Sequence, residues 1–199
     1  MKIPLQAFRK SLKKQRSSLS RHQQLHLSSL ATKRLQRLSV FRSAKNIAIY
    51  LPVRGEIDPS QLPAFGRANQ RFYLPVLSLY KKHGLVFVRW NKQTRFRLNQ
   101  YQIPEPVIKY SQLTSARKLD LVIMPLLAFD TTGSRLGMGG GYYDRSFAFK
   151  MRSGSKRKPT LLGIAYQFQQ AESLPRQSWD VPLDAIVTNT QFTAFASGS

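Results

Sequence analysis

The chain has 199 residues, of which 42% are hydrophobic and 11% aromatic. This suits one folded domain over residues 1–199 and excludes general disorder. Eleven glycines and eleven prolines are too few for a fibrous protein, and the absence of cysteine excludes disulfides, thiolate metal sites and a cysteine nucleophile. Thirty-two Lys and Arg against nine Asp and Glu give a formal net charge of +23, which favours anionic partners.

The charge is most one-sided at the start of the chain, because Glu56 is the first acidic residue. Such a field attracts nucleic acid, phosphates, a polyglutamate tail or an acidic membrane surface, although a general solubility role explains the charge equally well. A metal site or a carboxylate base must draw on nine residues: Glu56, Asp58, Glu105, Asp120, Asp130, Asp144, Glu172, Asp180 and Asp184. No run of about 18 apolar residues occurs, and no apolar segment follows the basic N-terminus. We therefore expect a cytoplasmic protein without a membrane span.

The first forty residues are predicted to form two amphipathic helices. Leu5, Phe8 and Leu12 recur at helical spacing in the first helix. Ser20 followed by Gln23 is a capping-box pattern that opens the second helix.

Short apolar, β-branched runs alternate with helical patterns along the rest of the chain. We predict strands at residues 46–51, 72–77, 85–90, 94–98, 119–124, 160–166 and 184–188, helices at 61–68 and 142–149, and a polar, mobile loop at 151–159. Residues 85–90 and 94–98 are predicted to form a hairpin with Asn91 at the turn. The expected fold class is α/β: a single-domain mixed, mostly parallel sheet with helices on both faces, Rossmann-like and three-layered.

Five glycines lie between residues 133 and 141, between a predicted strand and a predicted helix. At such a place, main-chain N–H groups and the positive end of the helix dipole can face an anion, and glycine lets the backbone approach phosphate oxygens. Arg135 adds a permanent positive charge. The spacing matches neither the Walker A motif nor the dinucleotide fingerprint, so a phosphate-binding loop and a plain tight turn both remain open.

Two carboxylates qualify as magnesium ligands. Asp144 follows the glycine loop on the first turn of the next helix, where it could hold Mg²⁺ against bound phosphates or act as an ordinary helix-start acid that matters little to packing. Asp180 stands between Trp179 and Val181, an apolar context in which a free carboxylate needs a partner or a metal.

The sequence of residues 135–145, RLGMGGGYYDR, resembles the signature of the 5-formyltetrahydrofolate cyclo-ligase family, also called methenyltetrahydrofolate synthetases. Further resemblances follow the family's order over nearly the whole chain: Arg9 and Arg16 in a basic N-terminal helix, Tyr50-Leu51 with Glu56, Glu105-Pro106, and Trp179-Asp180.

The resemblance implies an ATP- and Mg²⁺-dependent cyclisation of 5-formyltetrahydrofolate to 5,10-methenyltetrahydrofolate, with release of ADP and phosphate. It implies that Arg135 and Tyr143 are catalytic and that Asp144 and Asp180 bind the metal. The implied ATP-binding residues are Arg9, Arg135, Leu136, Gly137, Met138, Gly139, Gly140, Gly141, Tyr142 and Tyr143. The implied folate-binding residues are Leu51, Glu56, Met138, Gly139, Gly140, Gly141 and Tyr142. We expect a monomer that acts on a folate, polyglutamylated or not, without a membrane or nucleic-acid partner.

Two positions depart from the family pattern. Leu5 stands four residues before Arg9, where many members carry lysine, and Gly140 stands where some members carry lysine inside the loop. Each missing lysine weakens phosphate neutralisation, so a degenerate family member that binds nucleotide without turnover is one alternative. A basic RNA-binding protein is the other, although the sequence has no RNP-type aromatic motif and no zinc finger.

Other candidate residues have ordinary structural explanations. His22 and His26 have the spacing of a metal clip, but no acid lies near them, so we place them on a helix surface. The basic run 156–158 suits a solvated loop better than a contact with nucleic acid or a polyglutamate tail. Four aromatic residues are expected in or beside the core, where one of them could stack on a pterin: Phe87, Trp90, Phe96 and Tyr101.

Overall fold

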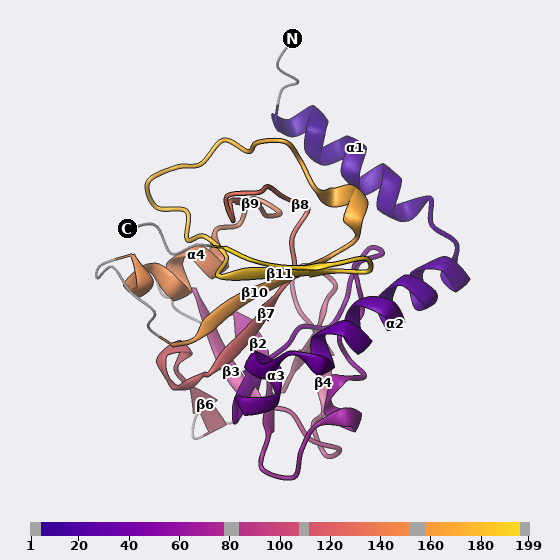
Figure 1. Ribbon diagram of the computed structural model, residues 1–199. Coiled ribbons are helices and arrows are strands. Elements are labelled where there is room, and N and C mark those ends of the chain that lie inside the picture. The colour runs from indigo at the N-terminus through magenta and orange to yellow at the C-terminus, as the bar shows by residue number, and fades with distance from the viewer. Residues whose placement is uncertain (1–4, 78–83, 108–111, 152–157, 196–199) are drawn as a thin grey trace.

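The computed structural model describes residues 5–77, 84–107, 112–151 and 158–195, and an eight-stranded sheet runs through its centre (Figure 1). The strand order is β12-β11-β10-β7-β1-β2-β3-β6. Strands β11, β10, β7, β1 and β2 are parallel neighbours, whereas β12, β3 and β6 join antiparallel. In chain order, the bounds are β1 (Asn46–Ala48), β2 (Arg71–Leu77), β3 (Leu85–Arg89), β6 (Leu113–Thr114), β7 (Leu121–Met124), β10 (Thr160–Ala165), β11 (Ala185–Thr188) and β12 (Phe192–Ala194). The mixed, mostly parallel sheet is confirmed.

Helices cover both faces of this sheet, as expected for three layers. The α-helices are α1 (Leu5–Ser17), α2 (Arg21–Arg37), α3 (Ser39–Ser43) and α4 (Tyr142–Phe147), and the 3₁₀ turns are η1 (Leu62–Phe65), η4 (Ala116–Lys118), η5 (Ala148–Lys150) and η6 (Gln167–Gln169). Helices α2 and α3 pack on one face, and α4 packs on the other. Helix α1 lies apart from the sheet, beside a small hairpin (Figure 1).

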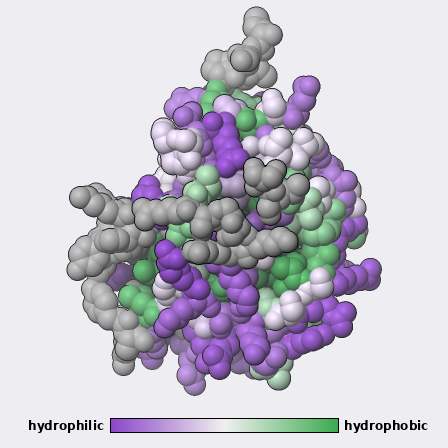
Figure 2. Space-filling view, turned by 60° about the vertical axis from the view of Figure 1, so that its left-hand side comes forward, coloured by the Kyte–Doolittle hydropathy of each residue, from purple (hydrophilic) through white to green (hydrophobic). Residues whose placement is uncertain are grey.

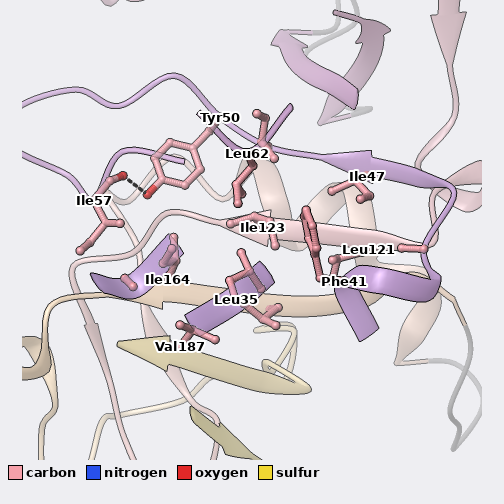
Figure 3. Packing of buried hydrophobic residues seen from close by; sticks show 14 of the residues in the cluster. Leu35, Phe41, Ile47, Tyr50, Ile57, Leu62, Leu121, Ile123, Ile164 and Val187 are labelled. Carbon is pink, nitrogen blue, oxygen red and sulfur yellow. Dashed lines mark hydrogen bonds between the residues drawn. The ribbon is translucent and has the colours of Figure 1, made fainter. Parts of the chain in front are cut away.

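The core alternates across the sheet because successive strand residues point to opposite faces. Ile47 in β1 faces α2 and α3, where it joins Leu35 and Phe41, as Figure 3 shows. Ala48, the next residue, faces α4 and shares a cluster with Phe147. Fully burying one such aliphatic or aromatic side chain contributes about 1.5–3 kcal/mol, so these two clusters fix the helices on their faces.

The predicted start of α2 is confirmed by its hydrogen bonds. The Gln23 amide donates to Ser20 Oγ at 3.2 Å, and the Ser20 amide donates to Gln23 Oε1 at 2.8 Å. This capping box satisfies two of the N–H groups that a helix leaves unpaired at its first turn. It also fixes where α1 ends and α2 begins.

The predicted hairpin between residues 85–90 and 94–98 is wrong. Strand β3 pairs with β2 and β6, so both its edges are occupied. The turn at Asn91 is present, because the Thr94 amide donates to the Asn91 carbonyl at 3.1 Å. Beyond it the chain leaves the sheet, and β4 (Phe96–Leu98) pairs with β5 (Pro104–Pro106) instead.

Several predicted elements are shorter than expected, and two strand pairings were not predicted. The strand at 46–51 ends at Ala48, and only η1 forms within 61–68. A hairpin of β8 (Ala128–Phe129) and β9 (Arg135–Leu136) precedes the glycine loop, and β12 closes one sheet edge. Most of the predicted loop at 151–159 lies outside the described residues.

The described part of the chain contains no helix long and apolar enough to cross a membrane. The face shown in Figure 2 is mostly hydrophilic, and its hydrophobic side chains gather in separate areas. This agrees with a surface that carries most of the 32 basic residues.

Candidate functional site

The candidate site lies where the parallel strands end. Strands β1, β7 and β10 are neighbours in the sheet and run in the same direction, so the segments that follow them emerge at one edge. In open α/β sheets this edge is where ligands bind. Three segments meet here: residues 50–56 after β1, residues 125–141 after β7, and residues 166–169 after β10.

The β8–β9 hairpin holds the start of the glycine loop through Asp130. Asp130 Oδ1 accepts from the Thr132 amide at 2.9 Å and the Ser134 amide at 3.0 Å, and Oδ2 accepts from the Leu174 amide at 2.9 Å. Burial acts to raise the pKa of Asp130, but these hydrogen bonds outweigh it and lower the pKa. Asp130 is therefore an ionised structural residue that fixes the hairpin turn.

The glycine loop itself is open. Gly139 has φ +101° and Gly141 has φ +60°, a region that favours glycine. A Cβ at Gly139 would meet nothing within 4 Å, whereas a Cβ at Gly140 would lie 2.7 Å from the Tyr142 ring. A lysine at position 140 would therefore require the ring of Tyr142 to move. Met138 is 43% exposed, and Gly139 and Gly140 beside it are exposed as well.

Arg135 and Asp144 form an ion pair across the loop. Arg135 Nη2 lies 2.5 Å from Asp144 Oδ1, and the Val181 amide donates to the same oxygen at 3.2 Å. Both side chains are largely buried, with 5% and 19% exposed. These contacts were not predicted for this first-turn acid, and through them Asp144 ties the loop to the segment before β11.

Asp180 sits differently from the expectation. Its Oδ2 accepts from the Gln177 amide at 2.8 Å, and the neighbouring Trp179 is 67% exposed. The surroundings are therefore not apolar, since the tryptophan points to solvent. Asp180 nevertheless lies next to Val181, whose amide touches Asp144, so the two acids occupy adjoining segments.

Helix α1 reaches the glycine loop from outside. Arg9 Nε donates to the Gly137 carbonyl at 3.3 Å. Phe8 and Leu12 pack on the β8–β9 hairpin, where Leu136 is buried. The structure therefore brings Arg9 to the loop and assigns Leu136 to the contact beneath the helix.

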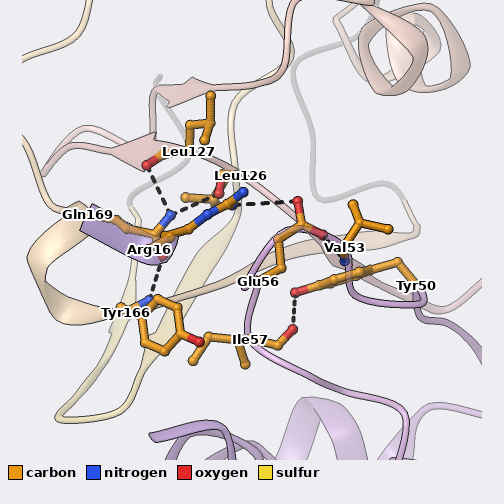
Figure 4. Close-up of polar contacts among 9 residues, drawn as sticks. All are labelled: Arg16, Tyr50, Val53, Glu56, Ile57, Leu126, Leu127, Tyr166 and Gln169. Atoms are coloured by element: carbon orange, nitrogen blue, oxygen red, sulfur yellow. Dashed lines mark hydrogen bonds and ion pairs between the residues drawn. The ribbon is translucent and has the colours of Figure 1, made fainter. Parts of the chain in front are cut away.

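Glu56 is the centre of a second, buried part of this edge (Figure 4). Its carboxylate lies 3.5 Å from Arg16 Nη1 in α1, and its Oε2 accepts from the Val53 amide at 3.1 Å. Burial raises the pKa of Glu56, and the Arg16 charge is the largest of the effects that oppose this rise. Glu56 and Arg16 thus form a desolvated pair inside the protein.

Three tyrosines surround this pair. Tyr50 donates to the Ile57 carbonyl at 2.7 Å, and Tyr166 is fully buried. The pKa values of Tyr50, Tyr143 and Tyr166 are raised, first by burial and also by the Glu56 charge. The Glu56 charge therefore acts on tyrosines at the end of β1 and in helix α4.

Sequence reasoning gave Arg16 no role, although a signal was present. Phe8, Leu12 and Arg16 are spaced by four, so they lie on one face of α1. The arginine continues an apolar stripe, which is unusual for a solvent-facing cation. Tyr101 was predicted to lie in or beside the core. It is instead 48% exposed, and its hydroxyl lies 2.7 Å from that of Tyr142.

The remaining candidates lie in several places, and one of them, Leu51, belongs to the segment after β1 that reaches this edge. Phe87 is buried and Trp90 packs beside the core as expected, whereas Phe96 is 41% exposed. Glu105 is buried and accepts from the Leu77 amide at 2.7 Å. Leu51 is half-buried against the core. The histidines of α2 are exposed as predicted, and of the basic run 156–158 only Lys158 is described, paired with Asp120.

No cluster of three or more His, Asp or Glu residues that could hold a metal occurs within the described ranges. Mg²⁺ does not require one, because it is commonly bound through one or two carboxylates together with substrate phosphates and water. Among the described residues, the hydrogen bonds from Arg135 and Val181 to Asp144 both fall on Oδ1, so Oδ2 is the oxygen that could bind a cation. Asp144 therefore has an oxygen that can bind Mg²⁺ together with phosphate and water, and Asp180 lies in the adjoining segment.

These features define a mixed α/β protein with a glycine loop, two arginines and a buried carboxylate at the carboxyl edge of its sheet. Residues 4–189 match the sequence model of the 5-formyltetrahydrofolate cyclo-ligase family, and the chain belongs to this family of ligases.

Two bacterial relatives match over nearly their whole length. The chain is 38% identical to the 5-formyltetrahydrofolate cyclo-ligase of Haemophilus influenzae, with 89% of this chain and 94% of the relative covered. It is 34% identical to that of Escherichia coli K12, with 89% and 96% covered. The solved structure of Aquifex aeolicus 5,10-methenyltetrahydrofolate synthetase superposes with a TM-score of 0.79 at 29% identity, covering 99% of this chain and 95% of the other.

Proposed function

We propose that this chain cyclises 5-formyltetrahydrofolate to 5,10-methenyltetrahydrofolate with ATP and Mg²⁺, releasing ADP and phosphate. The observation that carries the proposal is that α1 touches both parts of the site. Arg9 contacts the glycine loop and Arg16 contacts Glu56. A nucleotide on the loop and a folate at Glu56 would therefore lie next to each other.

The glycine loop is assigned to ATP. Main-chain N–H groups of residues 137–141, with Arg9 and Arg135, would neutralise the phosphates, while Leu136 supports the loop from below. Met138, Tyr142 and Tyr143 would line the nucleotide where it meets the folate. Phosphoryl transfer depends chiefly on position and charge neutralisation, and this set of residues supplies both.

The folate is assigned to Glu56, Leu51 and the inner side of the loop, residues 138–142. A pterin presents N–H donors that a carboxylate can accept in charge-assisted hydrogen bonds. Leu51 offers apolar contact next to Glu56. Tyr143 remains a neutral phenol at physiological pH, because burial raises its pKa well above the ordinary value. It can therefore donate a hydrogen bond to an oxygen that gains charge during the reaction.

The reaction then proceeds in two steps. The formyl oxygen attacks the γ-phosphorus, the bond to the ADP oxygen breaks, and the formyl carbon becomes an activated iminium phosphate. N10 of the folate attacks this carbon and loses its proton, and the C–O bond breaks to release phosphate. Arg135 would stabilise the charge on the transferred group. Holding the two substrates in contact supplies much of the rate acceleration.

Mg²⁺, held by Asp144 and Asp180 with the phosphates, would neutralise charge on the transferred group.

A basic pocket lined by Lys10, Lys13, Lys14, Ser17 and Arg54 adjoins the Glu56 segment. Its cations suit the carboxylates of a folate's glutamate tail, polyglutamylated or not. We further propose that the chain works as one domain, as a monomer, in the cytoplasm.

One assay tests the proposal against its alternatives. Purified protein is incubated with 5-formyltetrahydrofolate, ATP and Mg²⁺, and the absorbance of the methenyl product is followed. We expect product in amounts equal to the ADP released, and none without ATP or Mg²⁺. Nucleotide binding without product would indicate a degenerate family member. Neither activity together with RNA binding that weakens steeply with salt would indicate an RNA-binding protein.

A further inference from the structure

Arg16 is an unusual charged residue. It is fully buried in α1, and none of its three guanidinium nitrogens has a hydrogen-bond partner in the described part of the chain. Among the described residues it makes an ionic contact with Glu56, at 3.5 Å (Figure 4). Placing an arginine in such surroundings is unfavourable unless it is paired and hydrogen-bonded, so stability alone does not explain it.

The distance between the Arg16 guanidinium and the Glu56 carboxylate is longer than a charge-assisted hydrogen bond. A charge-assisted hydrogen bond between nitrogen and a carboxylate oxygen is about 2.7–2.9 Å long, whereas Arg16 Nη1 stands 3.5 Å from Glu56 Oε1. The pair is close enough for strong electrostatic attraction but does not occupy the carboxylate with a tight two-pronged contact. Glu56 keeps acceptor capacity for N–H donors of a ligand.

Two cations and three phenols interact electrostatically with Glu56. Arg16 comes from α1 and Arg54 from the same loop as Glu56, and Tyr50, Tyr143 and Tyr166 come from the end of β1, from α4 and from the end of β10. Arg54 is exposed, so water screens its charge. Arg16 is therefore the cation that acts on Glu56 without screening.

The face of helix α1 that carries Arg16 is also the face that contacts the glycine loop. Arg9 and Arg16 are seven residues apart, about two helical turns or 10 Å along the axis. Leu12, between them, is buried against the β8–β9 hairpin. The helix is therefore anchored at its middle and delivers one arginine to each part of the site.

We propose that Arg16 is a positioning residue for the folate: from α1 it keeps the Glu56 carboxylate charged and oriented while leaving its oxygens available to the substrate. This inference rests on the proposed function, in which Glu56 binds the pterin. It assigns to Arg16 an action through Glu56, without contact with the nucleotide.

The test is the pH dependence of folate use in Arg16→Met, which removes the charge and keeps a long apolar side chain. An opposite charge at this distance lowers a carboxyl pKa by about 1–3 units. We therefore expect the acidic limb of kcat/KM for 5-formyltetrahydrofolate to move up by about one pH unit or more. KM for the folate should rise about tenfold near neutral pH, and KM for ATP should stay unchanged. Arg16→Lys keeps the charge, so its acidic limb should stay near that of the wild type.

Two further variants separate this role from a structural one. Gln15→Met changes the adjacent, exposed position on α1 and should leave both KM values and the pH profile unchanged. In a Glu56→Gln background, Arg16→Met should shift no acidic limb, because the titrating group is gone. A structural role would instead lower the melting temperature and raise both KM values together, in either background.

The outcomes are distinct. A wild type that makes no methenyl product contradicts the proposed function, whatever Arg16 does. An active wild type whose Arg16→Met variant keeps its folate KM and acidic limb overturns the inference. If Arg16→Met does not fold, Arg16→Lys decides: a limb shifted upward by a full unit despite the retained charge contradicts the proposed role.

Discussion

At the scale of single residues, Asp144 combines two tasks. Its Oδ1 binds Arg135 and the Val181 amide, so it holds the glycine loop to the segment before β11. Arg135 is largely buried, and its Nε has no hydrogen-bond partner in the described ranges. Removing Asp144 would leave this guanidinium without its counter-charge, so a variant at this position affects stability as well as metal binding.

Asp144→Asn is therefore the informative change, because the amide keeps an acceptor for Arg135 but loses the charge. We expect turnover to fall about 100-fold or more and the half-saturating Mg²⁺ concentration to rise, with a loss of unfolding free energy of about 1–3 kcal/mol. Mg²⁺ titrations of activity and denaturant unfolding measure the two effects. Asp184→Asn is the matched control, since it breaks the Lys150–Asp184 ion pair outside the site and should reduce stability but keep activity. Unchanged Mg²⁺ dependence in Asp144→Asn would exclude Asp144 as a ligand.

At the scale of elements, the packing of Leu12 helps to hold α1 on the β8–β9 hairpin. Leu12 is 4% exposed and packs on the β8–β9 hairpin, and both arginines of the helix depend on this packing. Shortening Leu12 removes buried apolar area and leaves a cavity, a change that costs about 2–5 kcal/mol in a well-packed core. For a terminal helix, much of this loss should appear as local undocking of α1.

Leu12→Ala should therefore raise KM for ATP and KM for the folate together, because Arg9 and Arg16 leave their partners at the same time. Hydrogen exchange should show loss of protection within residues 5–17, with the β7 and β10 amides still protected. Leu25→Ala in α2, at a 53% exposed position, should change neither the two KM values nor the hydrogen exchange of α1. An increase in exchange in α1 with both KM values unaltered would show that α1 does not serve the site.

The central elements were predictable because their physics is local. Leu121–Met124 is a continuous apolar run, as expected for a parallel strand buried on both faces, and the capping box marks the start of α2. The pairing of β4 with β5 was not predictable, because three-residue strands carry no period and a partner is chosen by tertiary contacts. In the site, glycine content revealed the loop. The Arg16–Glu56 contact joins residues forty positions apart and exists only once α1 docks.

At the scale of the whole molecule, buried phenols limit stability at high pH. Burial is the first cause of the raised pKa values of Tyr50, Tyr143 and Tyr166. In the unfolded chain a tyrosine ionises near pH 10, so the folded state binds these protons more tightly. Their contribution to stability is complete below about pH 10 and is lost as pH rises above it.

In an alkaline titration, Tyr50, Tyr143 and Tyr166 should therefore ionise only together with loss of tertiary structure. Phenolate absorbance and near-ultraviolet circular dichroism, recorded on the same samples, compare the two events. Full ionisation of all eight tyrosines with an intact circular dichroism spectrum would contradict this expectation.

The net charge of +23 leads us to predict how salt affects the stability of the whole molecule. Nine acids cannot neutralise 32 basic residues, so at least 23 cations have no acidic partner of their own. Their repulsion opposes the compact state. Raising NaCl from about 0.01 M to about 0.15 M shortens the Debye length from about 30 Å to about 8 Å. We expect stabilisation of about 1 kcal/mol or more, seen as a rise in melting temperature of about 2–4 °C. KCl should act equally, because screening depends on ionic strength and not on the cation. A melting temperature that falls with NaCl would mean that the few ion pairs, such as Arg135–Asp144, outweigh the repulsion among the surface cations.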